Sequence, residues 1–143
     1  MGRQAGVYCY FKKANYKKFV NYNLRQYPKT IFKDSNNTMW ISLQKDEYNQ
    51  AKLYCIKNNS LKLVKIVKDN ISFIAQYDAN TLYFGSEKGL FKYKIDSGNL
   101  SFIKNTEGFN IRSIFIDNEK KIWLTTYEKG FFLYSDNKLY SNR

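Results

Sequence analysis

The chain has 143 residues, enough for one ordinary domain, and 18% of them are aromatic, a class that β-strands favour. It contains no histidine, which excludes a Ser-His-Asp triad, a histidine metal ligand and a phospho-accepting histidine on this chain. Cys9 and Cys55 are too few for a metal cage or a disulfide framework, and we expect each to be a buried, inert thiol. No run approaches the ~18 apolar residues of a membrane-spanning helix.

The net charge is +12 and is unevenly distributed. Residues 1–70 hold 14 Lys/Arg against 4 Asp/Glu, whereas residues 71–143 hold 10 against 8. A basic surface can attract nucleic acid, anionic sugars or membranes. Lysines in turns and on outward strand faces also keep a strand-rich chain soluble, and we favour this interpretation.

The N-terminal stretch "MGRQAGVYCYFKKAN" lacks the charged start, long apolar run and small-residue cleavage site of a secretion signal. Taken literally, this chain would therefore stay in the cytoplasm. The segment "FKKANYKKF" alternates aromatic residues with four lysines, a pattern that could bind a single nucleic-acid strand. The lysines of this segment are Lys12, Lys13, Lys17 and Lys18. The segment aligns with a hairpin farther along the chain that has no such lysine pairs, so we do not expect nucleic acid as a partner.

A polar turn followed by an aliphatic, an aromatic, an apolar and a small residue occurs three times along the chain. The copies are "SNNTMWIS" at 35–42, "DANTLYFG" at 78–85 and "NEKKIWLT" at 118–125. Alternating apolar stretches precede each copy, and "KGLFKY" at 88–93 recurs as "KGFFLY" at 129–134. Residues 6–20 align without a gap on residues 89–103 and form a further half copy. The chain therefore contains an internal repeat with a period of about 40 residues.

Four short strand segments in each 40–43-residue unit are typical of a β-propeller blade. We therefore predict an all-β fold, a partial β-propeller of about three and a half four-stranded blades in a single domain, 1–143. The predicted units are a half blade at 1–27 and blades at 28–68, 69–109 and 110–143. In the last unit we expect strands at 111–116, 121–125, 131–135 and 138–141, with Trp40, Tyr83 and Trp123 packed between neighbouring blades.

The block "IRSIFIDNEKKIWLTTYEKGFFLY" resembles the repeat of the two-component regulator propellers. Two copies depart from the family pattern: Lys52 replaces the hairpin glycine in the first, and Tyr77 and Tyr83 replace the Asp and Trp of the second. The repeat-motif positions of this chain are Asp34, Trp40, Tyr83, Gly85, Gly89, Tyr93, Asp117, Trp123, Thr125, Gly130 and Tyr134.

The resemblance implies the periplasmic sensor region of a bacterial hybrid histidine kinase, one that often senses polysaccharide breakdown products. We expect this chain to be part of such a sensor, completed by the remaining blades of a parent protein. Self-association of several chains into a closed ring is the alternative. An oligosaccharide is the expected ligand, and neither a cofactor nor a metal is expected.

Propellers bind ligands through loops and the starts of their inner strands. Candidate contacts are therefore Arg112, at the start of an inner strand, and Tyr127, in the loop before Gly130; an arginine and an aromatic ring suit anionic or stacked sugars. Catalysis by this chain is not expected, because its carboxylates fall mostly where turn chemistry explains them: Asp34, Asp78, Asp96, Asp117 and Asp136.

Overall fold

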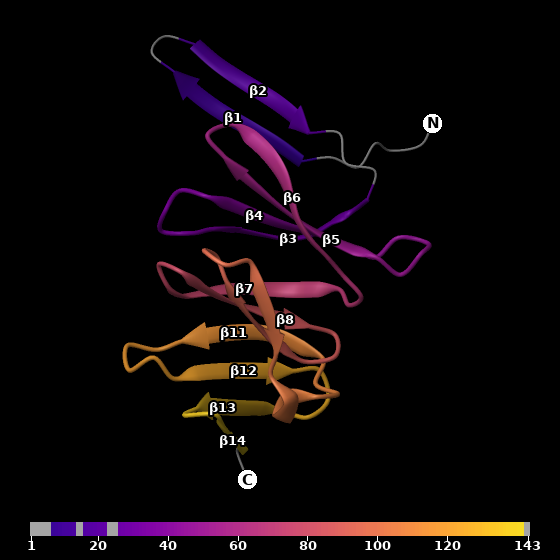
Figure 1. The fold of residues 1–143 in the computed structure, drawn as a ribbon, viewed down its shortest axis with the longest axis vertical. Helices are drawn as coiled ribbons and strands as arrows, with labels where there is room; N and C mark the ends of the chain where they lie inside the picture. Colours follow the sequence, from indigo (N-terminus) through magenta and orange to yellow (C-terminus); the bar gives the residue numbers. More distant parts are fainter. Residues whose placement is uncertain (1–6, 14–15, 23–25, 142–143) are drawn as a thin grey trace.

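The computed structural model describes residues 7–13, 16–22 and 26–141, with side chains from Gln26 onward. The fold is all-β: three four-stranded antiparallel sheets and one two-stranded hairpin (Figure 1). The hairpin pairs β1 (Val7–Lys13) with β2 (Tyr16–Tyr22). The first sheet contains β3 (Pro28–Lys33), β4 (Met39–Leu43), β5 (Ala51–Lys57) and β6 (Ser60–Val67).

The second sheet contains β7 (Ile71–Asp78), β8 (Thr81–Ser86), β9 (Leu90–Lys94) and β10 (Asn99–Phe102), followed by the single turn η1 (Lys104–Thr106). The third sheet contains β11 (Ile111–Ile116), β12 (Ile122–Thr126), β13 (Phe131–Ser135) and β14 (Lys138–Ser141). The strands predicted for the last repeat are thus confirmed, with β12 displaced by one residue.

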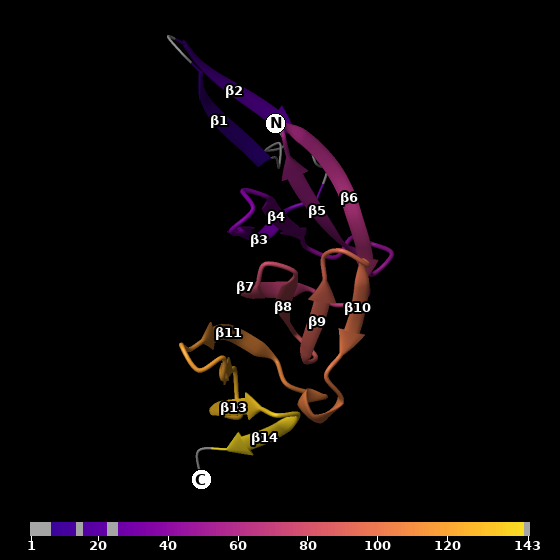
Figure 2. The same ribbon diagram turned by 60° about the vertical axis from the view of Figure 1, so that its left-hand side comes forward.

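Each sheet is a meander in which strands pair in chain order, and the sheets stack along the long axis of the molecule (Figures 1 and 2). The first strands of the sheets are neighbours, since β7 contacts β3 on one side and β11 on the other. Figure 2 shows the second sheet running from β7 on the left to β10 on the right. The second sheet is therefore buried on both faces, one against the first sheet and the other against the third.

Turn chemistry fixes the hairpins. The loops β5–β6 and β13–β14 each place two consecutive residues at positive φ, Asn58 and Asn59 in the first and Asp136 and Asn137 in the second. Two-residue hairpin loops require this conformation, and Asn and Asp tolerate it better than other residues that carry a side chain. The expected turn role of the aspartates is also observed at Asp78, whose Oδ1 accepts the Asn80 N–H at 2.9 Å.

Apolar side chains fill the spaces between the sheets. One buried cluster joins the first and second sheets: Trp40, Leu53, Ile71, Ile74, Leu82, Phe84 and Tyr93. A second joins the second and third sheets: Ala75, Tyr83, Leu90, Ile111, Ile114, Ile122, Leu124 and Tyr134. These clusters bury the large aliphatic and aromatic side chains whose removal from water drives folding.

Hydrogen bonds at equivalent places link the sheets as well. The Ser42 hydroxyl donates to the Ile71 carbonyl at 2.8 Å, and the Ser72 hydroxyl donates to the Ile111 carbonyl at 2.6 Å. Gly85 allows Ile111 to approach closely, because a Cβ at this glycine would lie 2.6 Å from Ile111 Cγ2. A side chain at residue 85 would therefore push the third sheet away.

Candidate functional site

The repeated Asp and Trp positions form one hydrogen-bonded unit in the first and third sheets. Asp34 Oδ1 accepts the backbone N–H groups of Asn36 and Thr38, and its Oδ2 accepts the Trp40 indole N–H at 2.9 Å. Asp117 does the same for the equivalent residues Glu119, Lys121 and Trp123, with an indole bond of 3.0 Å. The Trp123 hydrogen bond lowers the pKa of Asp117 below its ordinary value, as do the two backbone donors, although desolvation opposes them. These residues organise turns and the core.

The second sheet replaces this pair with two tyrosines. Tyr77 and Tyr83 stand at the Asp and Trp positions, and their rings pack edge to face with centroids 5.7 Å apart. Burial raises the pKa of Tyr83 to about 12, with smaller contributions from neighbouring tyrosines and Asp78. An aromatic contact therefore takes the place of the indole–carboxylate hydrogen bond.

The other motif residues also serve packing and turns. Tyr93 stacks on Phe84 with centroids 5.5 Å apart and meets Trp40 edge-on at 5.7 Å. The Tyr134 hydroxyl donates a hydrogen bond to Asn137 Oδ1 at 3.1 Å. The hydroxyl groups of Thr125 and Ser113 are hydrogen-bonded to each other at 2.5 Å. Gly89 and Gly130 have φ of 152° and 81°, conformations that side-chain-bearing residues rarely adopt.

Arg112 and Tyr127, the candidate contacts, lie together. The Arg112 guanidinium carbon is 5.1 Å from the centroid of the Tyr127 ring, which is a cation–π arrangement. Tyr127 is held there by its backbone N–H, which donates to the Asn110 carbonyl at 3.0 Å. Tyr127 is 63% exposed and Arg112 is exposed as well, so a ligand can reach both residues.

These two residues line a depression of about 370 Å³ beside the starts of β3, β7 and β11, which we term the strand-start depression. It is lined by Lys29, Asn70, Ser72, Glu87, Asn110, Ile111, Arg112 and Tyr127. Lys29 and Arg112 form no ion pair with any of residues 26–141. The depression thus combines two available cations with an exposed aromatic ring.

Glu87, the one carboxylate among the described residues that line the depression, already has partners. It forms an ion pair with Lys45 of the first sheet, and the Asn70 N–H lies 3.4 Å from Glu87 Oε1. Partial burial raises the pKa of Glu87, but the bonds from Lys45 and Asn70 outweigh it and the pKa is lower than its ordinary value. Its charge is therefore neutralised locally, and the depression favours an anionic ligand over a cationic one.

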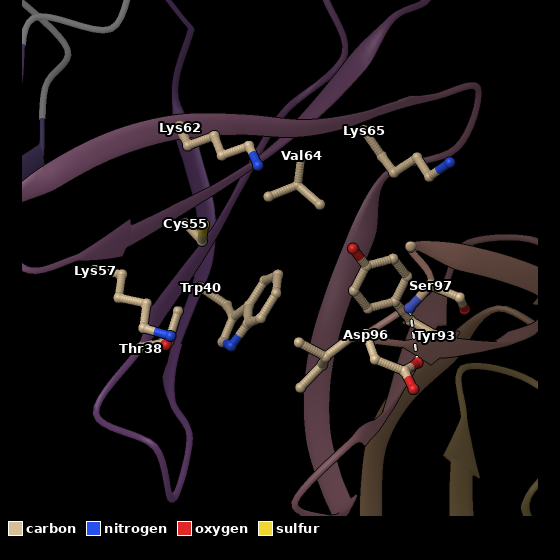
Figure 3. A pocket seen from close by; sticks show the side chains of 12 residues that line it. Thr38, Trp40, Cys55, Lys57, Lys62, Val64, Lys65, Tyr93, Asp96 and Ser97 are labelled. Atoms are coloured by element: carbon tan, nitrogen blue, oxygen red, sulfur yellow. Dashed lines mark hydrogen bonds between the residues drawn. The ribbon is translucent and has the colours of Figure 1, made fainter.

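A separate groove of about 420 Å³ lies between the first and second sheets (Figure 3). We term it the lysine groove, because Lys57, Lys62 and Lys65 line it; its other lining residues are Thr38, Trp40, Cys55, Val64, Tyr93, Ile95, Asp96, Ser97 and Gly98. Figure 3 shows Lys57 and Lys62 near Cys55 and Lys65 on the Tyr93 side.

Cys55 lies half-buried beside this groove and forms no disulfide. Burial raises the pKa of its thiol, and the nearby Asp34 charge does so too, whereas Lys62 and Lys57 lower it without reversing the shift. The thiol is therefore predominantly protonated at neutral pH and is not an activated nucleophile. The side chain of Cys9 lies outside the described residues.

Sequence reasoning missed the lysine groove because strict alternation along β6 would direct Lys62 and Lys65 to opposite faces. A β-bulge changes this: Leu53 pairs with Lys65 and Tyr54 with Leu63, so Val64 is the extra residue. Both lysines consequently border the groove. The lysines of the "FKKANYKKF" segment lie in the β1–β2 hairpin, where Lys12 pairs with Lys17, but their side chains lie outside the described residues.

Over the described part of the chain, no group of three or more acidic or thiol side chains could hold a metal ion. Nor does any helix there have the length and apolar character needed to cross a membrane.

Solved structures share this arrangement of sheets. The chain superposes over 96% of its length, with a TM-score of 0.73 and 15% identity, on the extracellular domain of BT4673 from B. thetaiotaomicron. That protein is described as a one-component and as a hybrid two-component system. At this level of identity the likeness shows a shared fold.

A second similar structure is PorZ, a surface component of the type-IX secretion system of Porphyromonas gingivalis, with a TM-score of 0.70 and 14% identity over 96% of this chain. The chain spans 20% of the BT4673 domain and 24% of PorZ. No protein-family model and no curated protein sequence matches it.

Proposed function

We propose that the chain is part of a ligand-sensing β-propeller that works outside the cytoplasm, in the periplasm, as a sensor region of a bacterial two-component regulator. The observation that carries the proposal is the likeness to the BT4673 extracellular domain over 96% of this chain. The resemblance of the chain's repeat to that of the two-component regulator propellers also supports it.

The stacking of the sheets supports the propeller geometry. In each sheet a cross-strand row faces the next sheet, and these rows are Phe32–Trp40–Cys55–Lys62, Ala75–Tyr83–Lys92–Ser101 and Phe115–Trp123–Leu133–Tyr140. Trp40 and Tyr83 are covered by the following sheet, with 3% and 5% exposure. In the last row, Phe115 is 66% and Tyr140 49% exposed. Such an aromatic face is suited to cover by another blade.

That blade belongs either to the remainder of a parent protein or to a second copy of this chain. Light scattering of the purified 143-residue chain separates the two cases. A dimer that Phe115→Ser dissociates identifies a second copy, provided that Tyr48→Ser, at a loop tyrosine that is also largely exposed, leaves the dimer intact. A monomer at all concentrations rules out self-association and leaves the parent blades.

We assign ligand recognition to the strand-start depression and expect a polysaccharide-derived ligand. Lys29 and Arg112 supply charge-assisted donors, and the Tyr127 ring supplies a surface on which a sugar can stack. The chain itself performs no catalysis in this proposal: its motif carboxylates Asp34 and Asp117 are engaged by turn and indole donors. Signalling would then pass to other modules of the parent.

Isothermal titration of the chain with a panel of neutral and acidic oligosaccharides tests this assignment. We expect Arg112→Ala and Tyr127→Ala each to weaken binding roughly tenfold, as truncation of an aromatic or arginine anchor commonly does. Lys138→Ala, on the exposed strand β14, is the control and should bind normally. Absence of binding to every oligosaccharide, or full binding by the Arg112 and Tyr127 variants, would contradict the assignment.

A further inference from the structure

Among the described residues that line the lysine groove, three lysines stand against one carboxylate, that of Asp96. Within residues 26–141, Lys57, Lys62 and Lys65 form no ion pair, and their backbones pair along β5 and β6. Lys57 and Lys62 line the groove near Cys55, and Lys65 lines it on the Tyr93 side (Figure 3). Neighbouring ammonium groups repel one another, and a bound anion would relieve this repulsion.

The equivalent groove between the second and third sheets provides an internal comparison. It is smaller, about 240 Å³, and Lys120 lies on its wall together with Tyr77, Tyr83 and Tyr134. The Lys120 ammonium donates to the Tyr77 carbonyl and lies 5.1 Å from the centroid of the Tyr77 ring. The Lys120 ammonium of the second groove is therefore already engaged, whereas no ion pair within residues 26–141 engages the ammonium groups of Lys57, Lys62 and Lys65.

The opposite rim of the lysine groove carries Asp96 and Ser97, at the turn between β9 and β10. Asp96 Oδ1 accepts the Ser97 N–H at 2.6 Å. Bonds from Asn80 and from Ser97 lower the pKa of Asp96 and keep it ionised at neutral pH, against a smaller desolvation effect. A ligand in this groove therefore meets ammonium donors from the first sheet and a carboxylate acceptor from the second.

Val64, Ile95 and Trp40 give the groove an apolar part of its wall. The volume of about 420 Å³ falls in the ~300–1,000 Å³ range of small-molecule sites. We propose that the lysine groove binds a hydroxylated small oxyanion, whose carboxylate or sulfate group contacts Lys57, Lys62 and Lys65 and whose hydroxyl groups donate toward Asp96. This site is separate from the strand-start depression and does not depend on its function.

Glucuronate is the probe, glucose is its neutral counterpart, and inorganic sulfate is an oxyanion without hydroxylated carbon atoms. The 143-residue chain is titrated with each by calorimetry and by amide chemical-shift mapping. We expect glucuronate to bind, to shift the amides of Lys62, Lys65 and Ser97, and to weaken as salt rises. Glucose should not bind detectably. Glucuronate shifts that avoid these amides, or equal binding of glucose, would overturn the proposal.

The Lys62→Gln/Lys65→Gln double variant should weaken glucuronate binding roughly tenfold or more, because charge-assisted hydrogen bonds are lost. Lys104→Gln/Lys138→Gln is the matched control, since it removes the same charge from two exposed lysines elsewhere. If both double variants weaken glucuronate binding equally, the loss comes from net charge alone, and the proposal of a specific site is overturned. Should the first variant fold poorly by circular dichroism, the wild-type shift map still decides the proposal.

Asp96→Asn tests the orientation of the ligand. Removal of a like charge should strengthen the binding of inorganic sulfate, whereas glucuronate should gain less because it loses a hydroxyl acceptor. An equal gain for both ligands would show that Asp96 acts only by repulsion and would overturn the hydroxyl contact.

Discussion

The Trp40 indole N–H donates to Asp34 Oδ2 at 2.9 Å, and both side chains are buried, with 3% and 5% exposure. The same bond joins Trp123 to Asp117 at 3.0 Å in the third sheet, but there Asp117 and Trp123 are half-buried. One motif is therefore present in two environments, which allows its energetic contribution to be measured by comparison.

Asp34→Ala should destabilise the chain, by about 1–3 kcal/mol, because a buried indole N–H and two turn N–H groups lose their acceptor. Asp117→Ala should destabilise it less, since water can reach Trp123. Urea unfolding followed by tryptophan fluorescence measures both. An equal or larger loss for Asp117→Ala would contradict the role of burial.

The Tyr77–Tyr83 pair of the second sheet should be exchangeable for the Asp–Trp pair as a unit. Tyr77→Asp alone leaves a carboxylate without its indole donor, and Tyr83→Trp alone places an indole N–H without an acceptor. The double variant supplies both the indole donor and the carboxylate acceptor. It should therefore be more stable, by ~0.5–3 kcal/mol, than the sum of the two single changes predicts. A double-mutant cycle in urea measures this coupling, and additive effects would refute it.

Gly89→Ala should be more destabilising than Gly130→Ala. Alanine at residue 130 faces open space and meets only the strain of φ 81°, which costs ~1–2 kcal/mol. At Gly89 a Cβ would lie 2.6 Å from the Phe102 ring and 2.9 Å from the Thr106 carbonyl, so crowding adds ~1–3 kcal/mol. Thermal unfolding of the two variants compares them, and similar melting temperatures would argue against crowding at η1.

Acid should remove a stabilising contribution from Glu87. Its pKa in the folded chain lies below the ordinary value of 4.5, so the contribution is present above pH 4.5 and is lost as the pH falls through the folded pKa. Glu87→Gln should cost about 1 kcal/mol or less at neutral pH, given the exposure of the pair.

The difference between wild type and Glu87→Gln should then shrink below pH 4.5 in urea titrations at several pH values. Glu119→Gln is the control, because the Glu119–Lys121 pair is largely exposed and lies within one loop. A constant difference between wild type and Glu87→Gln across this range would exclude the Lys45–Glu87 pair as its source.

Repeat spacing and turn residues predicted the all-β class and the strands of the last repeat within one residue. These features depend on local sequence, such as Asp117 at a turn and Gly130 at a hairpin corner. The proximity of Arg112 to Tyr127 depends on pairing between chain segments, as does the bulge at Val64 that brings Lys65 to the lysine groove. The local sequence around Val64 does not indicate a bulge, so the lysine groove was not predicted.

The hydroxyls of Ser42 and Ser72 each connect one sheet to the first strand of the next, and the buried clusters likewise join only adjacent sheets. Such a stack behaves like a one-dimensional array whose cooperativity passes from neighbour to neighbour. Native-state hydrogen exchange should accordingly show a gradient: amides of the second sheet, which is flanked on both faces, exchange most slowly, and β13 and β14 fray first. Stability in this molecule would then be a property of position in the stack rather than of any single sheet.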